Sequence, residues 1–383
     1  MKKRISIGLW ICLLGLVISN CVDKFDAHLP DDNTGLLVVE GNIISDSTVV
    51  FYLSRSIALD AEELPQDYNQ VNAKLSVMGS DGLHLDGVPL GNGRYQVDIG
   101  TLNKDVSYNL EIVYNGDTYT SDPQKPIETE AIDNVTFDQP KEYGDIYICI
   151  DTHSQGAAYY MWTYEEDWEV RAKYATIYYY EPETNTVTIY PSPPYAKGWC
   201  HVLSTETLIG TTEAHVDNRL KDKRVYSIAS HDDRVSCYYS TMMRQRKVSK
   251  GEYEYYQEKV KISEEMGGIF APQPSELPTN IVCSNPNKQV IGYVGVNMNV
   301  AEYRLSFSSK EVQFLSLRDC SILDKETVGK HYDIGLYLLG YRLVAWSAFG
   351  PRDECAWAPV ECTDVRSLGA TLNKPSFWPD EIN

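Results

Sequence analysis

VSYNLEIVYNGDTYTS, residues 106–121, is the stretch that predicts the fold class most directly. Apolar and polar residues alternate over 106–114, as in a β-strand with one buried face. Asn115-Gly116 follows, and this pair readily adopts the positive φ angles of a two-residue hairpin turn. Residues 118–121 return as a second strand. The stretch therefore predicts a β-hairpin and indicates a fold built from antiparallel strands.

The same pattern of short strands and tight turns extends back from this hairpin towards residue 36. Asp81-Gly82 and Asp86-Gly87 supply further turns. No helical period appears here, and six or seven short strands in about 90 residues are typical of an immunoglobulin-like sandwich. We predict an immunoglobulin-like β-sandwich over residues 36–125, with its other strands at 36–40, 48–53, 71–77 and 95–99.

A domain boundary is expected within residues 122–140, which hold three prolines among acidic and small residues. Residues 131–383 form the second predicted unit, again mostly β, with a hairpin of strands 174–180 and 186–190. The predicted fold is thus mainly β: an N-terminal immunoglobulin-like β-sandwich followed by a larger antiparallel β domain with one or two short helices.

One helix interrupts the β pattern of the second unit. Ser249 and Glu252 fit a capping box, in which the serine accepts from the amide three residues on and the glutamate reaches back. Gly267-Gly268 offers a left-handed stop about four turns later. The spacing predicts a helix between these two signals.

The first 21 residues predict an export address. A basic head at residues 2–4 precedes the apolar run 5–18, which is too short to span a bilayer. Cys21 follows, as in a bacterial lipoprotein signal. We expect removal of residues 1–20, acylation of Cys21 and an acidic flexible tether over 21–35, so that the lipid bilayer holds the mature protein through its acyl groups.

Charge narrows the classes of partner. The formal charge of the full chain is −20, and loss of three basic groups with residues 1–20 brings it to −23. Binding to nucleic acid depends on Lys and Arg that neutralise phosphates, so we expect no nucleic acid as a partner. The chain has 28 tyrosines against 8 phenylalanines, which favours strands with half-wet surfaces.

Nine cysteines fall to seven when Cys12 and Cys21 are set aside. An exported compartment permits disulfides, but the sequence alone leaves their connectivity open. Cys355 with Cys362 would close a small loop, and Cys200 with Cys237 is a second pairing. Cys149 alternates with isoleucines and is expected to be a buried unpaired thiol. The candidate disulfide cysteines are Cys200, Cys237, Cys283, Cys320, Cys355 and Cys362.

Residues 160–169, YMWTYEEDWE, place four carboxylates beside two tryptophans. A glycosidase uses such a carboxylate pair with sugar-stacking aromatic rings. Adjacent carboxylates in a strand point to opposite faces, however, so they cannot flank one glycosidic bond. We expect an aromatic, core-packing face of Trp162, Tyr164, Glu166 and Trp168, and a solvated acidic face of Thr163, Glu165, Asp167 and Glu169.

Other catalytic and metal-binding patterns are missing from the sequence. Neither Gly-x-Ser-x-Gly nor His-Glu-x-x-His occurs, and no glycine-rich phosphate loop is present. His201, His215 and His231 are scattered, and no two cysteines have the spacing of a zinc knuckle. We therefore expect no enzymatic activity, no metal and no cofactor.

Motifs spread along the chain carry a family resemblance. The most specific is Gly267-Gly-Ile-Phe-Ala-Pro-Gln-Pro-Ser275, followed by Asn280-Ile-Val-Cys283 and Val290-Ile-Gly-Tyr293. Further motifs lie at 37–42, 160–169, 199–200, 251–256 and 362–378. Together they resemble domain-of-unknown-function family 4249, a set of Bacteroidota lipoproteins. In the tail a second cysteine would be expected near Val365, and its absence implies that Cys355 supplies the partner.

The resemblance implies an outer-membrane lipoprotein, of a kind often encoded beside TonB-dependent transporters. The acidic residues after Cys21 imply that it faces the cell surface. The expected function is a non-catalytic accessory subunit that docks on such a transporter and helps to capture or gate cargo. The alternative is a stand-alone glycan-binding or adhesin-type lipoprotein with a glycan or peptide ligand, for which Tyr178, Tyr180 and Tyr190 form the candidate binding surface.

Overall fold

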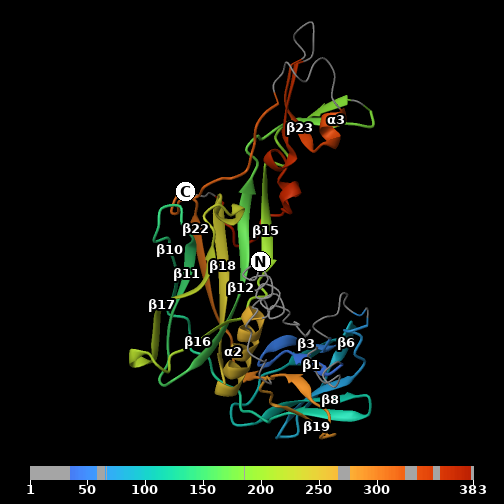
Figure 1. The fold of residues 1–383 in the computed structure, drawn as a ribbon, viewed down its shortest axis with the longest axis vertical. Coiled ribbons are helices and arrows are strands. Elements are labelled where there is room, and N and C mark those ends of the chain that lie inside the picture. Colours follow the sequence, from blue (N-terminus) through green and yellow to red (C-terminus); the bar gives the residue numbers. More distant parts are fainter. Residues whose placement is uncertain are drawn as a thin grey trace, which may run out of the picture.

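The computed structural model describes residues 35–57, 65, 67–184, 186–265, 277–323, 334–347 and 354–380. The predicted signal peptide, the predicted acylation site at Cys21, most of the predicted tether and the Gly267-Gly268 stop lie outside these residues. The fold is mainly β. Figure 1 shows three parts along the long axis: an N-terminal sandwich, a central pair of sheets and a small distal unit. No helix among the described residues is long and apolar enough to cross a membrane.

The N-terminal part is a β-sandwich of two five-stranded sheets. One sheet has the order β20 (Val290–Gly292), β1 (Leu37–Glu40), β3 (Ser47–Arg55), β7 (Arg94–Ile99) and β6 (Val88–Gly91). The other has the order β19 (Ile281–Cys283), β9 (Asp117–Ser121), β8 (Tyr108–Tyr114), β4 (Lys74–Gly79) and β5 (His84–Asp86). Alternate residues of the facing strands, such as Phe51, Val77 and Leu110, form the shared core.

The hairpin predicted at residues 106–121 is confirmed as β8 and β9. Tyr114 pairs with Asp117 across the turn, and Asn115 and Gly116 have φ angles of 50° and 84°. Two successive left-handed residues are the geometry of a two-residue hairpin turn that matches the twist of its strands. The period-two pattern is confirmed as well, because Tyr108, Leu110 and Ile112 are buried.

Three strands from late in the sequence complete this sandwich. The sequence analysis did not predict their pairing. β20 runs parallel to β1, with Leu37 opposite Val290, and β19 runs antiparallel to β9. A third, β21 (Val296–Asn297), pairs with β2 (Ile43–Ile44). The expected separation into residues 36–125 and 131–383 is therefore wrong here, because residues 281–297 pair with strands of the first unit.

The central part packs a three-stranded sheet on a longer one. The first has the order β10 (Asn134–Asp138), β11 (Ile146–His153) and β17 (Arg219–Ile228). The second has the order β15 (Lys197–Leu203), β12 (Tyr159–Arg171), β18 (Tyr238–Val248) and β22 (Ala301–Ser308), with β16 (Leu208–Thr211) also paired to β12. Ile148, Trp162, Tyr239 and Phe307 belong to their shared core.

Helix α2 (Lys250–Glu265) lies between the central sheets and the sandwich (Figure 1). The predicted start is confirmed, since the Ser249 hydroxyl accepts from the Glu252 amide at 3.1 Å. The Glu252 side chain is buried, and it accepts from Arg246 of β18 at 2.7 Å. Arg246 also donates to Asn297 of β21 at 2.7 Å, so one guanidinium links the central sheet, the helix and the sandwich.

The distal unit projects from the far end of the central part (Figure 1). It contains β13 (Tyr178–Glu181), β14 (Thr186–Ile189), α3 (Ile334–Leu338), β23 (Tyr341–Ser347) and β24 (Glu354–Pro359). It has a small core of its own, in which Tyr180, Leu343 and Trp357 are buried. The hairpin predicted over 174–190 is confirmed, although its first strand begins only at Tyr178.

Residues 35–130 expressed alone should not form a stable sandwich. They would lack Ile281, Val290, Val294 and Val296, four buried core side chains worth about 1.5–3 kcal/mol each. Joining residues 277–298 to this fragment through a flexible linker should restore a cooperative thermal transition, measured by circular dichroism. A cooperative transition of residues 35–130 alone within about 5 °C of the joined fragment would contradict the role of these strands, since 1 kcal/mol shifts the midpoint by about 4–8 °C.

Candidate functional site

The acidic stretch 160–169 lies in β12, at the centre of the longer central sheet. Its alternation is confirmed: Trp162 and Tyr164 are buried in the core between the central sheets. The expected solvated acidic face is wrong, because the side chains of Asp167 and Glu169 are only 6% and 0% exposed. Two groups of residues cover them: cationic side chains of the sheet, and the C-terminal segment.

Glu169 has a nearly complete set of partners. Its carboxylate lies 2.6 Å from the Arg171 guanidinium and 2.9 Å from the Lys197 ammonium. It also accepts from the Cys237 thiol at 3.2 Å and from the Trp378 indole at 3.1 Å. Burial opposes its ionisation, but the hydrogen bonds from Lys197, Cys237 and Arg171 outweigh burial and lower its pKa. Burial and the Glu169 carboxylate together raise the pKa of Cys237 to about 12, so this thiol stays protonated.

The neighbouring acids of the outer face form a ladder of alternating charges. Asp167 lies 2.8 Å from the His201 ring and 3.5 Å from the Arg304 guanidinium. Glu165 lies between Arg304 and Arg244, at 3.8 Å and 3.2 Å. The cross-strand pairing of β15, β12, β18 and β22 brings these residues together.

The C-terminal segment closes this face. Thr371 pairs with Trp199 of β15, and the Phe377 ring lies 3.7 Å from the guanidinium carbon of Arg304. The Trp378 ring contacts Tyr238 edge to face. A β-carbon on Gly198 would lie 2.8 Å from the Thr371 carbonyl oxygen, so glycine is required for this close approach. The segment converts a row of strand carboxylates into a buried layer.

Glu166 lies on the opposite face of β12, inside the central core. Its carboxylate accepts from Arg234 at 2.9 Å and from the Tyr239 hydroxyl at 2.6 Å. The Tyr239 hydroxyl also lies 2.8 Å from that of Tyr226. Burial, then Tyr226 and Glu166, raise the pKa of Tyr239 well above its usual value, so the tyrosine remains a donor.

These contacts define what the acidic stretch does chemically. Glu166 and Glu169 are buried and held by cations and hydrogen-bond donors, so neither is poised to protonate a leaving group or to attack a substrate. Within the described ranges no group of three or more His, Cys, Asp and Glu residues is placed to hold a metal ion. The stretch is an ion-paired structural layer.

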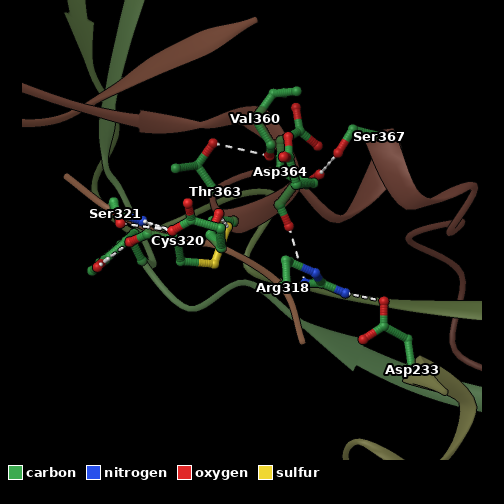
Figure 2. Close-up of a disulfide and its surroundings, with 12 residues drawn as sticks. Asp233, Arg318, Cys320, Ser321, Val360, Thr363, Asp364 and Ser367 are labelled. Carbon is green, nitrogen blue, oxygen red and sulfur yellow. Dashed lines mark hydrogen bonds and ion pairs between the residues drawn. A yellow bond between two sulfur atoms is a disulfide. The ribbon is translucent and has the colours of Figure 1, made fainter. Parts of the chain in front are cut away.

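One disulfide joins Cys320 to Cys362, which are 42 residues apart in sequence. The expected pairing of Cys355 with Cys362 is therefore wrong. Figure 2 shows Arg318 beside this disulfide, and it donates to Asp233 of η3 (Asp233–Val235) and, at 3.0 Å, to the Glu361 carbonyl. The disulfide and Arg318 together fix the connection between the central part and the distal unit.

The other predicted thiol pairing also fails. Cys200 and Cys237 are both unpaired. Strand β12 lies between them, because Cys200 is in β15 and Cys237 immediately precedes β18. Two strand spacings are about 9–10 Å, beyond the reach of a disulfide. Cys283 is unpaired at the edge of the sandwich, and Cys149 is a buried unpaired thiol, as the strand pattern predicted.

The three candidate tyrosines do not form one exposed surface. Tyr180 is buried against Trp357 and Tyr337 of the distal unit. Tyr178 is half-buried beside the same core, and Tyr190 is half-buried and contacts Tyr179 edge to face. The hairpin sequence did not reveal the burial of Tyr180, because Tyr337 and Trp357 lie more than 150 positions later.

Two leucines that the sequence analysis missed are exposed on the distal unit. Leu338 ends α3 and Leu339 follows it, and each is 76% exposed. Gly340 then turns the chain at a φ of 89° into β23. The apolar run around them resembles a buried segment, and only the glycine that ends the helix signals an exposed turn.

An aliphatic groove lies at the edge of the sandwich, where β19, β20 and the end of α2 meet. Its volume is about 640 Å³. The lining residues are Leu36, Ile262, Leu277, Thr279, Ile281, Val282, Cys283, Pro286, Lys288, Gln289, Val290 and Ile291. No sequence motif predicted it, because its walls come from three separate parts of the chain.

Replacing Glu169 with Gln should lower the free energy of unfolding at pH 7 by about 1–3 kcal/mol, because buried donors lose a charged acceptor. Since the folded protein lowers the pKa of this carboxyl, its contribution is present above the usual value of 4.5 and is lost as the pH falls through the folded value. The difference between the two proteins should therefore shrink below about pH 4.5 in urea unfolding. Glu302→Gln, at a half-exposed site on the same face, is the control. A difference that does not change with pH would contradict this role.

Comparison with known proteins adds two likenesses among solved structures. The chain is similar to a segment of two fibronectin type-III domains from chicken tenascin, at 11% identity over 56% of this chain and 91% of that chain, with a TM-score of 0.15. It is also similar to a DUF4785 family protein from Legionella pneumophila, at 9% identity over 55% of this chain and 52% of that one, with a TM-score of 0.16. Curated proteins yield no significant match.

The model of one family matches residues 22–304. The match includes the sandwich, its three late strands, the acidic stretch of β12 and helix α2. It ends within β22, so the tail motifs at 362–378 lie beyond it. Because the matched residues make up most of the sequence, the chain belongs to the family described as Domain of unknown function (DUF4249).

Proposed function

We propose that this protein is a non-catalytic outer-membrane lipoprotein that docks on a TonB-dependent transporter and helps to capture or gate its cargo. Membership of the DUF4249 family supports the proposal. The lipoprotein-type sequence ending at Cys21 supports the membrane address. The observation that carries the docking role is the exposure of Leu338 and Leu339, 76% each, on a unit that projects from the body.

The distal unit is suited to present a contact surface. Helix α3 packs on the core of the unit, which includes Tyr180, Leu343 and Trp357. The Cys320–Cys362 disulfide lies where the distal unit joins the central part. Two adjacent leucines that stay exposed on a supported helix end bury apolar area on binding without a large ordering cost. We therefore expect the partner to have an apolar pocket that receives Leu338 and Leu339.

The charged layer of β12 favours a binding role over catalysis. Its acids are engaged with arginines, lysine, histidine and tyrosine, so they stiffen the central sheet. The alternative function, a glycan-binding or adhesin-type lipoprotein, loses its main motivation because Tyr180 is buried and Tyr178 packs beside it. Docking is thus the better-supported class.

Replacing Cys21 with Ala should release the protein from the outer membrane. Acyl groups on Cys21 would be the membrane anchor. No helix of the described residues is long and apolar enough to cross the bilayer. Fractionation of cells that express each form, followed by immunoblotting, measures the change. Retention of the variant in the outer membrane at the wild-type level would refute the lipid anchor.

Replacing both Leu338 and Leu339 with Ser should weaken partner binding by about 1–3 kcal/mol, or roughly 5- to 150-fold. Affinity is measured with the transporter that co-purifies from native membranes in mild detergent. Leu203→Ser, at an exposed leucine on β15 (62% exposed), is the matched control and should bind like wild type. Unchanged binding by the double variant would show that the interface lies elsewhere. Failure to recover any transporter would refute the docking function.

A further inference from the structure

The aliphatic groove at the edge of the sandwich occupies a defined place in the fold. β19 is the edge strand of one sheet of the sandwich and β20 is the edge strand of the other. Residues 281–292 therefore cross from sheet to sheet, and the groove lies along this crossing, with Ile262 of α2 and Leu36 before β1 completing its wall. Its volume of about 640 Å³ falls in the range of sites that enclose a small ligand.

The apolar lining is entirely aliphatic. Ile281 and Val290 line the groove where it meets the sandwich core, and they are 3% and 7% exposed. Val282 lines the groove yet is 62% exposed, so a bound apolar group would remove it from water. Sugars and nucleobases are commonly recognised by stacking on aromatic rings, and none of the lining residues is aromatic. The surface matches a hydrocarbon chain better than a ring.

The polar groups of the groove lie towards solvent. Lys288 is exposed, and its ammonium pairs with Asp117 of β9. Gln289 is exposed beside it. The Thr279 hydroxyl is already committed, because it donates to the Gly292 carbonyl at 2.7 Å. A ligand with an apolar body and a polar head would bury the body against the aliphatic lining and leave the head in water near Lys288 and Gln289.

We propose that this groove binds a fatty acyl chain. Such a chain has two sources: a free fatty acid or membrane lipid, and the acyl group proposed on Cys21. Leu36 lines the groove and is 15 residues after Cys21, and an extended stretch of that length spans at most about 50 Å, so the groove is within reach of a lipid on Cys21. Binding of a free acyl chain does not rest on the proposed function, whereas occupation by the protein's own lipid does.

The first test uses residues 22–383, which contain every described residue and no acylation site. Titration with dansyl-labelled undecanoic acid should show saturable binding of one probe per protein. Val282→Asp should weaken this binding at least tenfold, because it places a charge in the groove. Val88→Asp changes a valine of similar exposure, 59%, on another edge strand of the same sandwich and should bind like wild type. Absence of saturable binding, or equal loss in both variants, would overturn the proposal.

The second test separates the two sources. The full-length protein purified from membranes is placed in lipid nanodiscs with a diazirine-labelled palmitic acid, and mass spectrometry reports both the modification of Cys21 and the labelling of residues 277–292. Labelling as strong as in residues 22–383 assigns the groove to exogenous chains. Labelling reduced at least fivefold in protein acylated on Cys21 assigns it to the attached lipid. A protein that lacks acylation but still binds the probe would refute the proposed anchor and leave the groove assignment intact.

Discussion

The buried ion pair between Arg246 and Glu252 fixes how the parts of the molecule are joined. Arg246 belongs to the central sheet, Glu252 to the first turn of α2, and Asn297, which also accepts from Arg246, to a strand of the sandwich. Both charged residues are nearly inaccessible to water, and removal of one partner from such a pair typically costs about 3–5 kcal/mol. Gly295 leaves room for the carboxylate, since a β-carbon there would lie 2.2 Å from a Glu252 oxygen. Hydrogen bonds from Asn297 to the Lys247 carbonyl and between Tyr293 and Ser249 reinforce this contact, so the orientation of the sandwich on the central sheets is fixed by a cluster around Arg246.

Local signals predicted the parts of the fold that depend on neighbours in sequence. The Asn115-Gly116 turn, the alternation of β8 and the helix start at Ser249 are all encoded within a few residues. The failures share a different cause. The late strands of the sandwich, the burial of Glu169 under Trp378 and the burial of Tyr180 against Trp357 depend on pairs of segments more than 150 residues apart. The sequence of a strand with an unpaired edge does not specify which distant segment will pair with that edge.

The same distinction explains the candidate sites. An acidic stretch with tryptophans suggests a sugar-cleaving cleft until the partners of each carboxylate are known, and those partners arrive from β15, η3, β22 and the C-terminal segment. The exposed leucines of the distal unit and the aliphatic groove carry no motif at all. Each depends on which apolar side chains the fold leaves uncovered, a property of the assembled surface and not of any window of sequence.

The Cys320–Cys362 bond also ties the shape of this protein to the redox state of its surroundings. It links the chain that enters the distal unit to the chain that leaves it, beside the contact between Arg318 and Asp233. In a reducing compartment the sandwich and the central sheets would keep their cores, but the distal unit would lose the covalent link at its base. Compartments that oxidise thiols are those outside the cytoplasm. With the export proposed above, this link would form only outside the cytoplasm, so the unit that carries Leu338 and Leu339 would be fixed only in the compartment of the proposed partner.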